Sequence, residues 1–121
     1  MAHLNNPRDV VPVSVMPAYS WLLQSELRTD DLTAHLRAQR AVGVPYTDDM
    51  IASAAVDAYG QAAPDSDAAE GVSKRYGKAT TVRVFDGKPA VLTEMDAVVA
   101  YLQVLGRLTD AAYKPVADAR Q

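Results

Sequence analysis

The chain has 121 residues, which suits one small domain. Its formal net charge is −3, and its 12 Lys and Arg residues are outnumbered by 15 Asp and Glu. A protein that holds nucleic acid needs a basic face, so we exclude nucleic acid as a partner. The sequence contains no cysteine, which excludes disulfides, thiolate nucleophiles and iron–sulfur ligation within these residues.

Neither a membrane segment nor a targeting segment is predicted. No apolar run approaches the about 20 residues that span a bilayer, and the N-terminus lacks the pattern of a signal peptide. We therefore expect the chain as written to be soluble. Hydrophobic residues make up 49% of the chain, but alanine supplies much of this and aromatic residues only 7%. The core is therefore expected to be small.

The N-terminal region is predicted to be a stiff loop. Residues 2–6 resemble the last turn of a helix whose earlier part is missing, because proline at position 7 would end such a helix. Prolines at 7, 12 and 17 then oppose regular helix and predict an extended loop over 7–20, with one helical turn near 19–23. Apolar residues occur throughout the loop, so it requires an apolar surface to lie against. These residues are Val10, Val11, Val13, Val15 and Met16.

Two helices are predicted in the middle of the chain, near 30–42 and 47–63. Leu32 and Leu36 mark the apolar face of the first, and Gly43 follows it as a C-cap. Thr47 can cap the second, which is expected to end before Pro64. Residues 64–80 have a weak pattern and are interpreted as a surface loop with some helix.

A third helix is predicted near 93–106 and is the clearest element of the chain. Thr93 and Asp96 form a variant of the capping box, and Gly106 is expected to end the helix. Between them an apolar stripe has helical spacing; it consists of Met95, Val98, Val99, Leu102 and Leu105. Residues 81–85 alternate like a short strand without an evident partner, and 111–121 are expected to form a flexible tail. The predicted fold class is all-α, with long loops and little or no strand.

Few residues are candidates for chemistry. His3 and His35 lack a second ligand at metal-binding spacing, and the serines lack a recognisable catalytic base. Helix caps and solvated loops explain the paired aspartates. Met16 remains, because a methionine thioether is a soft, neutral ligand suited to haem iron. Methionine also fills gaps in apolar cores, and the residues alone favour this second interpretation.

A family resemblance changes that balance. Residues 6–19 resemble the distal-methionine loop of the mono-haem cytochrome c subunit (subunit II) of cbb3-type cytochrome c oxidases. Residues 43–48 and 75–78 resemble later segments of that subunit, and residues 85–87, 93–97 and 101–106 resemble its final helix. The resemblance covers residues 2–110 in the family's order. It implies that residues 1–110 are the C-terminal part of a cytochrome c-like helical domain.

The resemblance also implies roles for particular residues. Met16 matches the distal ligand of the haem iron, and Val13, Val15, Pro17 and Tyr19 match the loop that supports it. Tyr101 and Leu102 match positions where the final helix packs, so their role is structural. The family carries a membrane anchor and a C-x-x-C-H haem-attachment motif upstream of the matched residues. We therefore expect a fragment whose intact subunit holds haem c, and we expect this chain alone to bind none.

The function implied by the resemblance is electron transfer toward oxygen in a respiratory chain. The partners would be the other subunits of the cbb3-type oxidase, on the periplasmic side of the bacterial inner membrane. The chain itself supplies no catalytic residue. The alternative is a haem-free helical interaction module that docks through the apolar loop and the stripe of Met95, Val98 and Leu102, or a fragment with no independent activity.

Overall fold

The structure is a computed structural model that describes residues 1–112, with side chains described as far as residue 108. Seven α-helices and one short 3-10 helix make up this range, which contains no strand. The only β-type pairing among the described residues is an isolated antiparallel bridge between Glu26 and Thr93. The predicted all-α fold is thus confirmed, and residues 81–85 form no strand.

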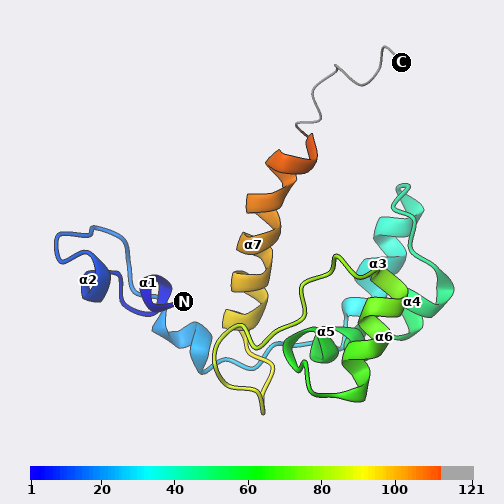
Figure 1. Ribbon diagram of the computed structural model, residues 1–121, viewed down its shortest axis with the longest axis horizontal. Helices are drawn as coiled ribbons and strands as arrows, with labels where there is room; N and C mark the ends of the chain where they lie inside the picture. Colours follow the sequence, from blue (N-terminus) through cyan, green and yellow to red (C-terminus); the bar gives the residue numbers. More distant parts are fainter. Residues whose placement is uncertain (113–121) are drawn as a thin grey trace.

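The helices form three groups along the chain (Figure 1). An N-terminal arm contains α1 (Ala2–Asn5), α2 (Pro7–Val10) and the 3-10 helix η1 (Ser20–Leu23). A bundle contains α3 (Leu32–Ala41), α4 (Asp48–Ala52), α5 (Ala54–Ala62) and α6 (Asp67–Tyr76). The long helix α7 (Glu94–Ala112) stands between the arm and the bundle.

The arm contains more helix than the prolines predict. Pro7 begins the single-turn helix α2 instead of only ending α1. A proline is tolerated at the first helical position because its missing N–H would have no intrahelical acceptor there. The loop that follows returns to the start of the chain, where the Tyr19 N–H donates to the Leu4 carbonyl at 2.8 Å. The predicted turn near 19–23 is present as η1.

The predicted helix over 47–63 is divided in two. The Thr47 hydroxyl caps α4 as expected, accepting from the Met50 N–H at 3.2 Å. Ser53 then leaves helical geometry with φ −95° and ψ 5°, and α5 begins at the next residue. Serine has a side chain that competes for backbone hydrogen bonds, so it is a weak interior helix residue. The ten-residue helix α6 lies in the stretch interpreted as mainly loop.

Helices α5 and α6 pack at close range. A Cβ added to Gly60 would lie 2.7 Å from the backbone of Ala68, so only glycine permits this approach. Buried apolar side chains from α4, α5 and α6 form a small core: Ile51, Ala54, Ala62, Ala69 and Val72. Arg75 of α6 donates to the buried carboxylate of Asp57 on α5, with Nε 2.8 Å from Oδ2, and also pairs with Asp49 at 3.4 Å.

The start of α7 is fixed by a buried polar network. The Asp96 N–H donates to the Thr93 hydroxyl at 3.2 Å, and the Thr93 N–H donates to the Asp96 carboxylate at 3.0 Å. This is the reciprocal capping that the sequence predicts. The Thr93 hydroxyl also lies 2.7 Å from Oδ2 of Asp86, whose backbone N–H donates to Asp96. The loop 86–93 is thereby tied to the helix that follows it.

Helix α7 does not end at Gly106 as predicted but runs to Ala112. Glycine lowers helix propensity by about 1 kcal/mol and does not by itself end a helix when the flanking residues favour helix. Helix α7 also contacts the segment that follows α6, since Arg107 donates to the Ala79 carbonyl at 3.4 Å. The predicted flexible tail, residues 111–121, overlaps the last turn of α7 and otherwise lies outside the described residues.

Candidate functional site

Met16 lies in the loop between α2 and η1. Its side chain is half-buried, and its backbone N–H donates to the Ser14 hydroxyl at 3.2 Å. The Ser14 N–H in turn donates to the Val11 carbonyl at 2.9 Å. Two short-range hydrogen bonds therefore shape the chain immediately before the methionine, and neither involves its sulfur.

The two valines beside Met16 are almost fully exposed. The exposed fraction is 87% for Val13 and 98% for Val15. Single exposed apolar residues are normal on a protein surface, but Val10 and Val11 of the same arm are exposed as well. The expectation that this loop needs an apolar surface to lie against is thus not met by any residue that the structure describes.

The remaining predicted loop residues differ in their roles. Tyr19 is half-buried and closes the base of the loop through its backbone bond to Leu4. Pro17 is exposed and follows Met16 directly, which restricts the methionine to extended backbone conformations. The loop predicted over residues 7–20 is thus present over 11–19, whereas residues 7–10 form α2.

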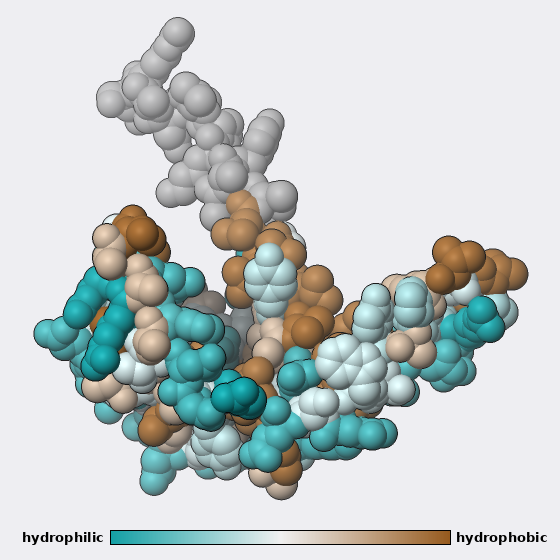
Figure 2. Space-filling view, turned by 180° about the vertical axis from the view of Figure 1, so that it is seen from behind, coloured by the Kyte–Doolittle hydropathy of each residue, from teal (hydrophilic) through white to brown (hydrophobic). Residues whose placement is uncertain are grey.

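The apolar stripe of α7 is divided between the interior and the surface. Met95 is completely buried and Val98 is half-buried, whereas 49% of Leu102 is exposed. Further exposed apolar side chains lie on the same part of the helix; they are Tyr101, Val104, Leu105 and Leu108. Figure 2 shows this hydrophobic surface along the central helix, and a second one at the tip of the N-terminal arm.

Acid–base and metal chemistry find no support among the described residues. No group of three His, Cys, Asp or Glu side chains lies close enough to hold a metal ion. His35 is exposed on α3, with its Nε2 3.8 Å from the Asp31 carboxylate. The Asp48 carboxylate lies 2.6 Å from Arg40, and this hydrogen bond lowers the pKa of Asp48. These are contacts of a solvated helix surface.

The chemistry of the available donors fits one side of a haem. A thioether is a neutral ligand for haem iron, and apolar neighbours exclude water from such a ligand. Met16 supplies the thioether, and the exposed Val13 and Val15 would exclude water from it only when a haem face covers them. The thiols and the histidine of a C-x-x-C-H attachment motif are not among these 121 residues.

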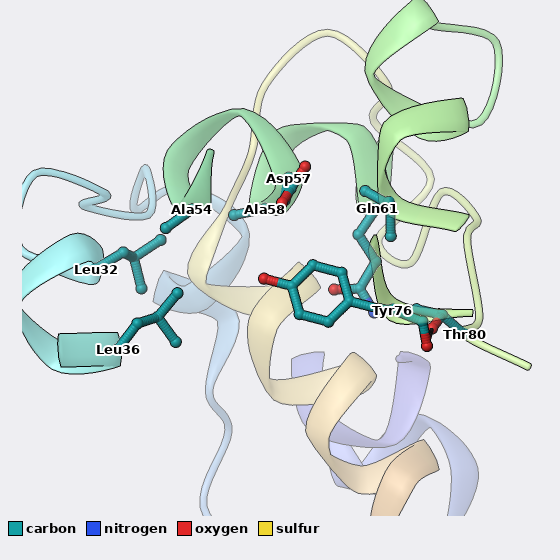
Figure 3. A pocket seen from close by; sticks show the side chains of 9 residues that line it. Leu32, Leu36, Ala54, Asp57, Ala58, Gln61, Tyr76 and Thr80 are labelled. Carbon is teal, nitrogen blue, oxygen red and sulfur yellow. Dashed lines mark hydrogen bonds between the residues drawn. The ribbon is translucent and has the colours of Figure 1, made fainter. Parts of the chain in front are cut away.

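The structure also contains a cavity that the sequence did not indicate, between α3, α5 and α6 (Figure 3). Leu32 and Leu36 were interpreted as the packing face of their helix, and both line this cavity. The signal that could have revealed it is the small size of Ala54 and Ala58 on the facing helix, which cannot fill the space opposite two leucines.

The chain was also compared with known protein families. A family model described as "Cytochrome C oxidase, mono-heme subunit/FixO" matches residues 1–109. A comparison with curated proteins found no match. Within residues 1–112, no helix combines the length and the apolarity that crossing a membrane requires.

Proposed function

The chain belongs to the family of mono-haem subunits of cytochrome c oxidase (FixO), and from this premise we propose that Met16 is the distal ligand of haem c in the intact subunit. Members of this family serve electron transfer within a cbb3-type oxidase, which is a membrane complex of several subunits. The resemblance seen in the sequence thus agrees with the family match. The role of Met16 is the finer proposal.

The observation that carries the proposal is the exposure pattern of the loop. Met16 is half-buried, while the side chains before it at Val13 and Val15 are exposed by 87% and 98%. Burying two valines stabilises a protein by about 1.5–3 kcal/mol each, so leaving them in water forgoes a large gain. A haem face laid against this loop would cover both and bring an iron within reach of the one soft ligand there.

The loop is also suited to hold a ligand in place. The Tyr19 bond to Leu4 fixes one end, and the Ser14 hydroxyl accepts from the Met16 N–H beside the ligand itself. Ligation by Met and His raises the reduction potential of haem c. The protein's part in this chemistry would be to position Met16 and to exclude water with Val13 and Val15. Pro17 would keep the backbone at Met16 out of helix.

The location and partners follow as part of the same proposal. The attachment motif and the second axial ligand would come from the family's upstream segment, on the periplasmic side of the bacterial inner membrane. Electrons would pass through this subunit toward the oxygen-reducing subunit. The catalytic reduction of oxygen would belong to that complex, and this chain would contribute to electron transfer within it.

The decisive test is Met16→Ala in the complete subunit, where haem c is attached covalently. We expect the Soret band to remain and the weak red absorption of Met–iron ligation to disappear. Met50→Ala is the matched control, because Met50 is also half-buried but lies on α4. If the red absorption survives Met16→Ala, another residue is the ligand and the proposal is wrong.

A second test uses this chain directly. A haem c peptide that carries its own histidine has one open axial position, which the chain can occupy through Met16. Red absorption should appear on mixing with the wild-type chain or with Met50→Ala, and should be absent with Met16→Ala. Free haem added without the peptide should form no covalent bond to the chain, because the sequence contains no attachment thiol.

One observation favours a second candidate function, the haem-free interaction module. The outer side of α7 presents Tyr101, Leu102 and Leu105 to solvent. Met95, the first residue of the stripe proposed for docking, is buried and cannot contact a partner. The exposed part of the stripe therefore begins about two helical turns after Met95, at Leu102. Leu102→Gln and Leu105→Gln should then weaken the association of the haem-free chain with the other oxidase subunits. Unchanged association would contradict the interaction module.

A further inference from the structure

Helix α3 is attached to the bundle by polar contacts instead of a packed face. It contributes no buried residue. The Thr33 hydroxyl donates to the Ile51 carbonyl at 3.2 Å, and Arg40 pairs with Asp48 at 2.6 Å. These contacts hold the helix beside α4 on both sides of Leu36. The two leucines of α3 are therefore directed at the bundle without reaching its core.

The space in front of these leucines is a cavity of about 420 Å³. Its apolar wall comes from Leu32 and Leu36 on α3 and from Ala54 and Ala58 on α5 (Figure 3). The buried Val72 of α6 also lines it. Cavities that bind small molecules have volumes of about 300–1,000 Å³ and are mostly apolar with a few polar groups. The cavity satisfies both conditions.

The polar groups of the cavity are uncharged or already paired. Asp57 is engaged by Arg75 through its guanidinium group. Gln61 donates its amide to the Thr81 carbonyl at 3.2 Å, which leaves its side-chain oxygen as an acceptor. A charged ligand would find no free countercharge here, and burying it would be costly. The lining therefore selects a neutral molecule.

Tyr76 supplies the directional group. In Figure 3 its ring lies across the cavity and its hydroxyl points toward the side of Ala54 and the leucines. No hydrogen bond to this hydroxyl is present among the described residues. Burial raises the pKa of Tyr76, with the nearby Asp57 carboxylate adding to the effect, so the group is a neutral O–H at physiological pH. It can donate to, or accept from, one ligand atom.

We propose that this cavity binds a small, uncharged molecule of one or two rings that carries one hydroxyl or carbonyl group. The ring lies between the two leucines of α3 and the alanines of α5, and the polar group bonds to the Tyr76 hydroxyl. This site is separate from the Met16 loop, and it requires neither haem nor the oxidase partners. Its ligand is recognised by shape, by apolar contact and by one hydrogen bond.

The test uses 4-methylphenol and toluene, which differ only in a hydroxyl group. Amide shifts of the full chain are followed by heteronuclear NMR as each compound is added. We expect saturable shifts centred on Leu36, Ala58 and Tyr76 for both compounds. 4-Methylphenol should bind more tightly by about 3- to 10-fold, the effect of one neutral hydrogen bond.

Two filling variants and one control decide the outcome. Ala58→Leu places a larger side chain in the cavity and should abolish the binding of both compounds, whereas Ala55→Leu, at an exposed position of the same helix, should leave it intact. If Ala58→Leu does not fold, Leu36→Phe fills the space from the opposite wall and should have the same effect. Binding that survives either folded filling variant, or shifts that never saturate in the wild type, would overturn the proposal.

Tyr76→Phe tests the hydrogen bond separately. It should remove the preference for 4-methylphenol over toluene and leave the affinity for toluene unchanged. A preference that persists in Tyr76→Phe would overturn the assignment of this hydroxyl.

Discussion

The bundle and the N-terminal arm use apolar residues in opposite ways. In the bundle, Ile51 and Val72 are almost completely buried, and the charged Arg75 is paired with a buried carboxylate. In the arm, Val13 and Val15 remain in water, although the backbone around them is hydrogen-bonded. The bundle thus buries apolar residues between its helices, whereas the tip of the arm leaves its valines exposed.

This difference shows what each region depends on. The bundle satisfies its buried groups with its own residues, so its stability resides within the chain. The arm leaves Val13 and Val15 in water, where the proposed haem would cover them. Substitutions in the bundle should therefore lower the free energy of unfolding of the isolated chain. Substitutions at Val13 and Val15 should leave it nearly unchanged.

The largest effect is expected from Arg75→Met. It removes the partner of the Asp57 carboxylate, which is 4% exposed, and leaves that charge buried without compensation. Such a loss costs about 3–5 kcal/mol; we expect about 3 kcal/mol, because a fifth of the Arg75 side chain remains in water. The measurement is urea unfolding followed by circular dichroism.

The matched control is Lys74→Met on the same helix. Lys74 lies 3.9 Å from Glu70, and both side chains are about four-fifths exposed. A pair of this kind contributes about 0–0.5 kcal/mol. Equal losses for Arg75→Met and Lys74→Met would show that the buried pair does not hold α5 and α6 together.

A smaller loss is expected from Thr93→Val at the start of α7. The substitution keeps the shape of the side chain but removes a hydroxyl that lies 2.7 Å from Asp86 and accepts from the Asp96 N–H. Leaving buried polar groups without partners costs about 1–3 kcal/mol. Thr81→Val is the control, because no hydrogen bond involves the hydroxyl of Thr81 in the described part of the chain. Its midpoint in urea should equal that of the wild type.

The third effect depends on pH. Burial raises the pKa of Tyr76 above its ordinary value of about 10, so the folded chain resists ionisation more than the unfolded chain does. The stability from the neutral hydroxyl is complete below pH of about 10 and is lost as the pH rises through the folded-state pKa. Tyr76→Phe should therefore flatten the decrease in the urea midpoint between pH 9 and 11. An unchanged slope would contradict this.

The elements that local patterns specify were predicted correctly. The cap at Thr47, the capping box at Thr93 and the apolar stripe from Met95 fixed the starts of α4 and α7. Each depends on residues within a few positions of one another, which a sequence displays directly. The Met16 loop was located for the same reason, since its prolines and valines are contiguous.

The features that depend on distant residues were missed. Residues 64–80 were expected to be a loop with some helix, and the extent of α6 was underestimated because only Ala69 and Val72 are buried on it. The contact that stabilises α6 joins Arg75 to Asp57, 18 positions earlier. The break at Ser53 and the continuation past Gly106 depend on small differences in helix propensity, which the apolar pattern did not resolve. The cavity beside Tyr76 exists because two leucines meet two alanines from another helix, which no local pattern shows.

The smallest change in the free energy of unfolding is expected at the tip of the arm, in the double variant Val13→Ser with Val15→Ser. Because both side chains already lie in water, we expect the free energy of unfolding to change by less than about 0.5 kcal/mol. Val72→Ala, at a position 2% exposed in the bundle, should cost about 1–3 kcal/mol under the same conditions. A loss above about 1 kcal/mol for the serine pair would mean that the chain itself covers the loop. In the complete subunit the same pair should weaken the Met–iron absorption, because the serines would admit water beside the Met16 sulfur.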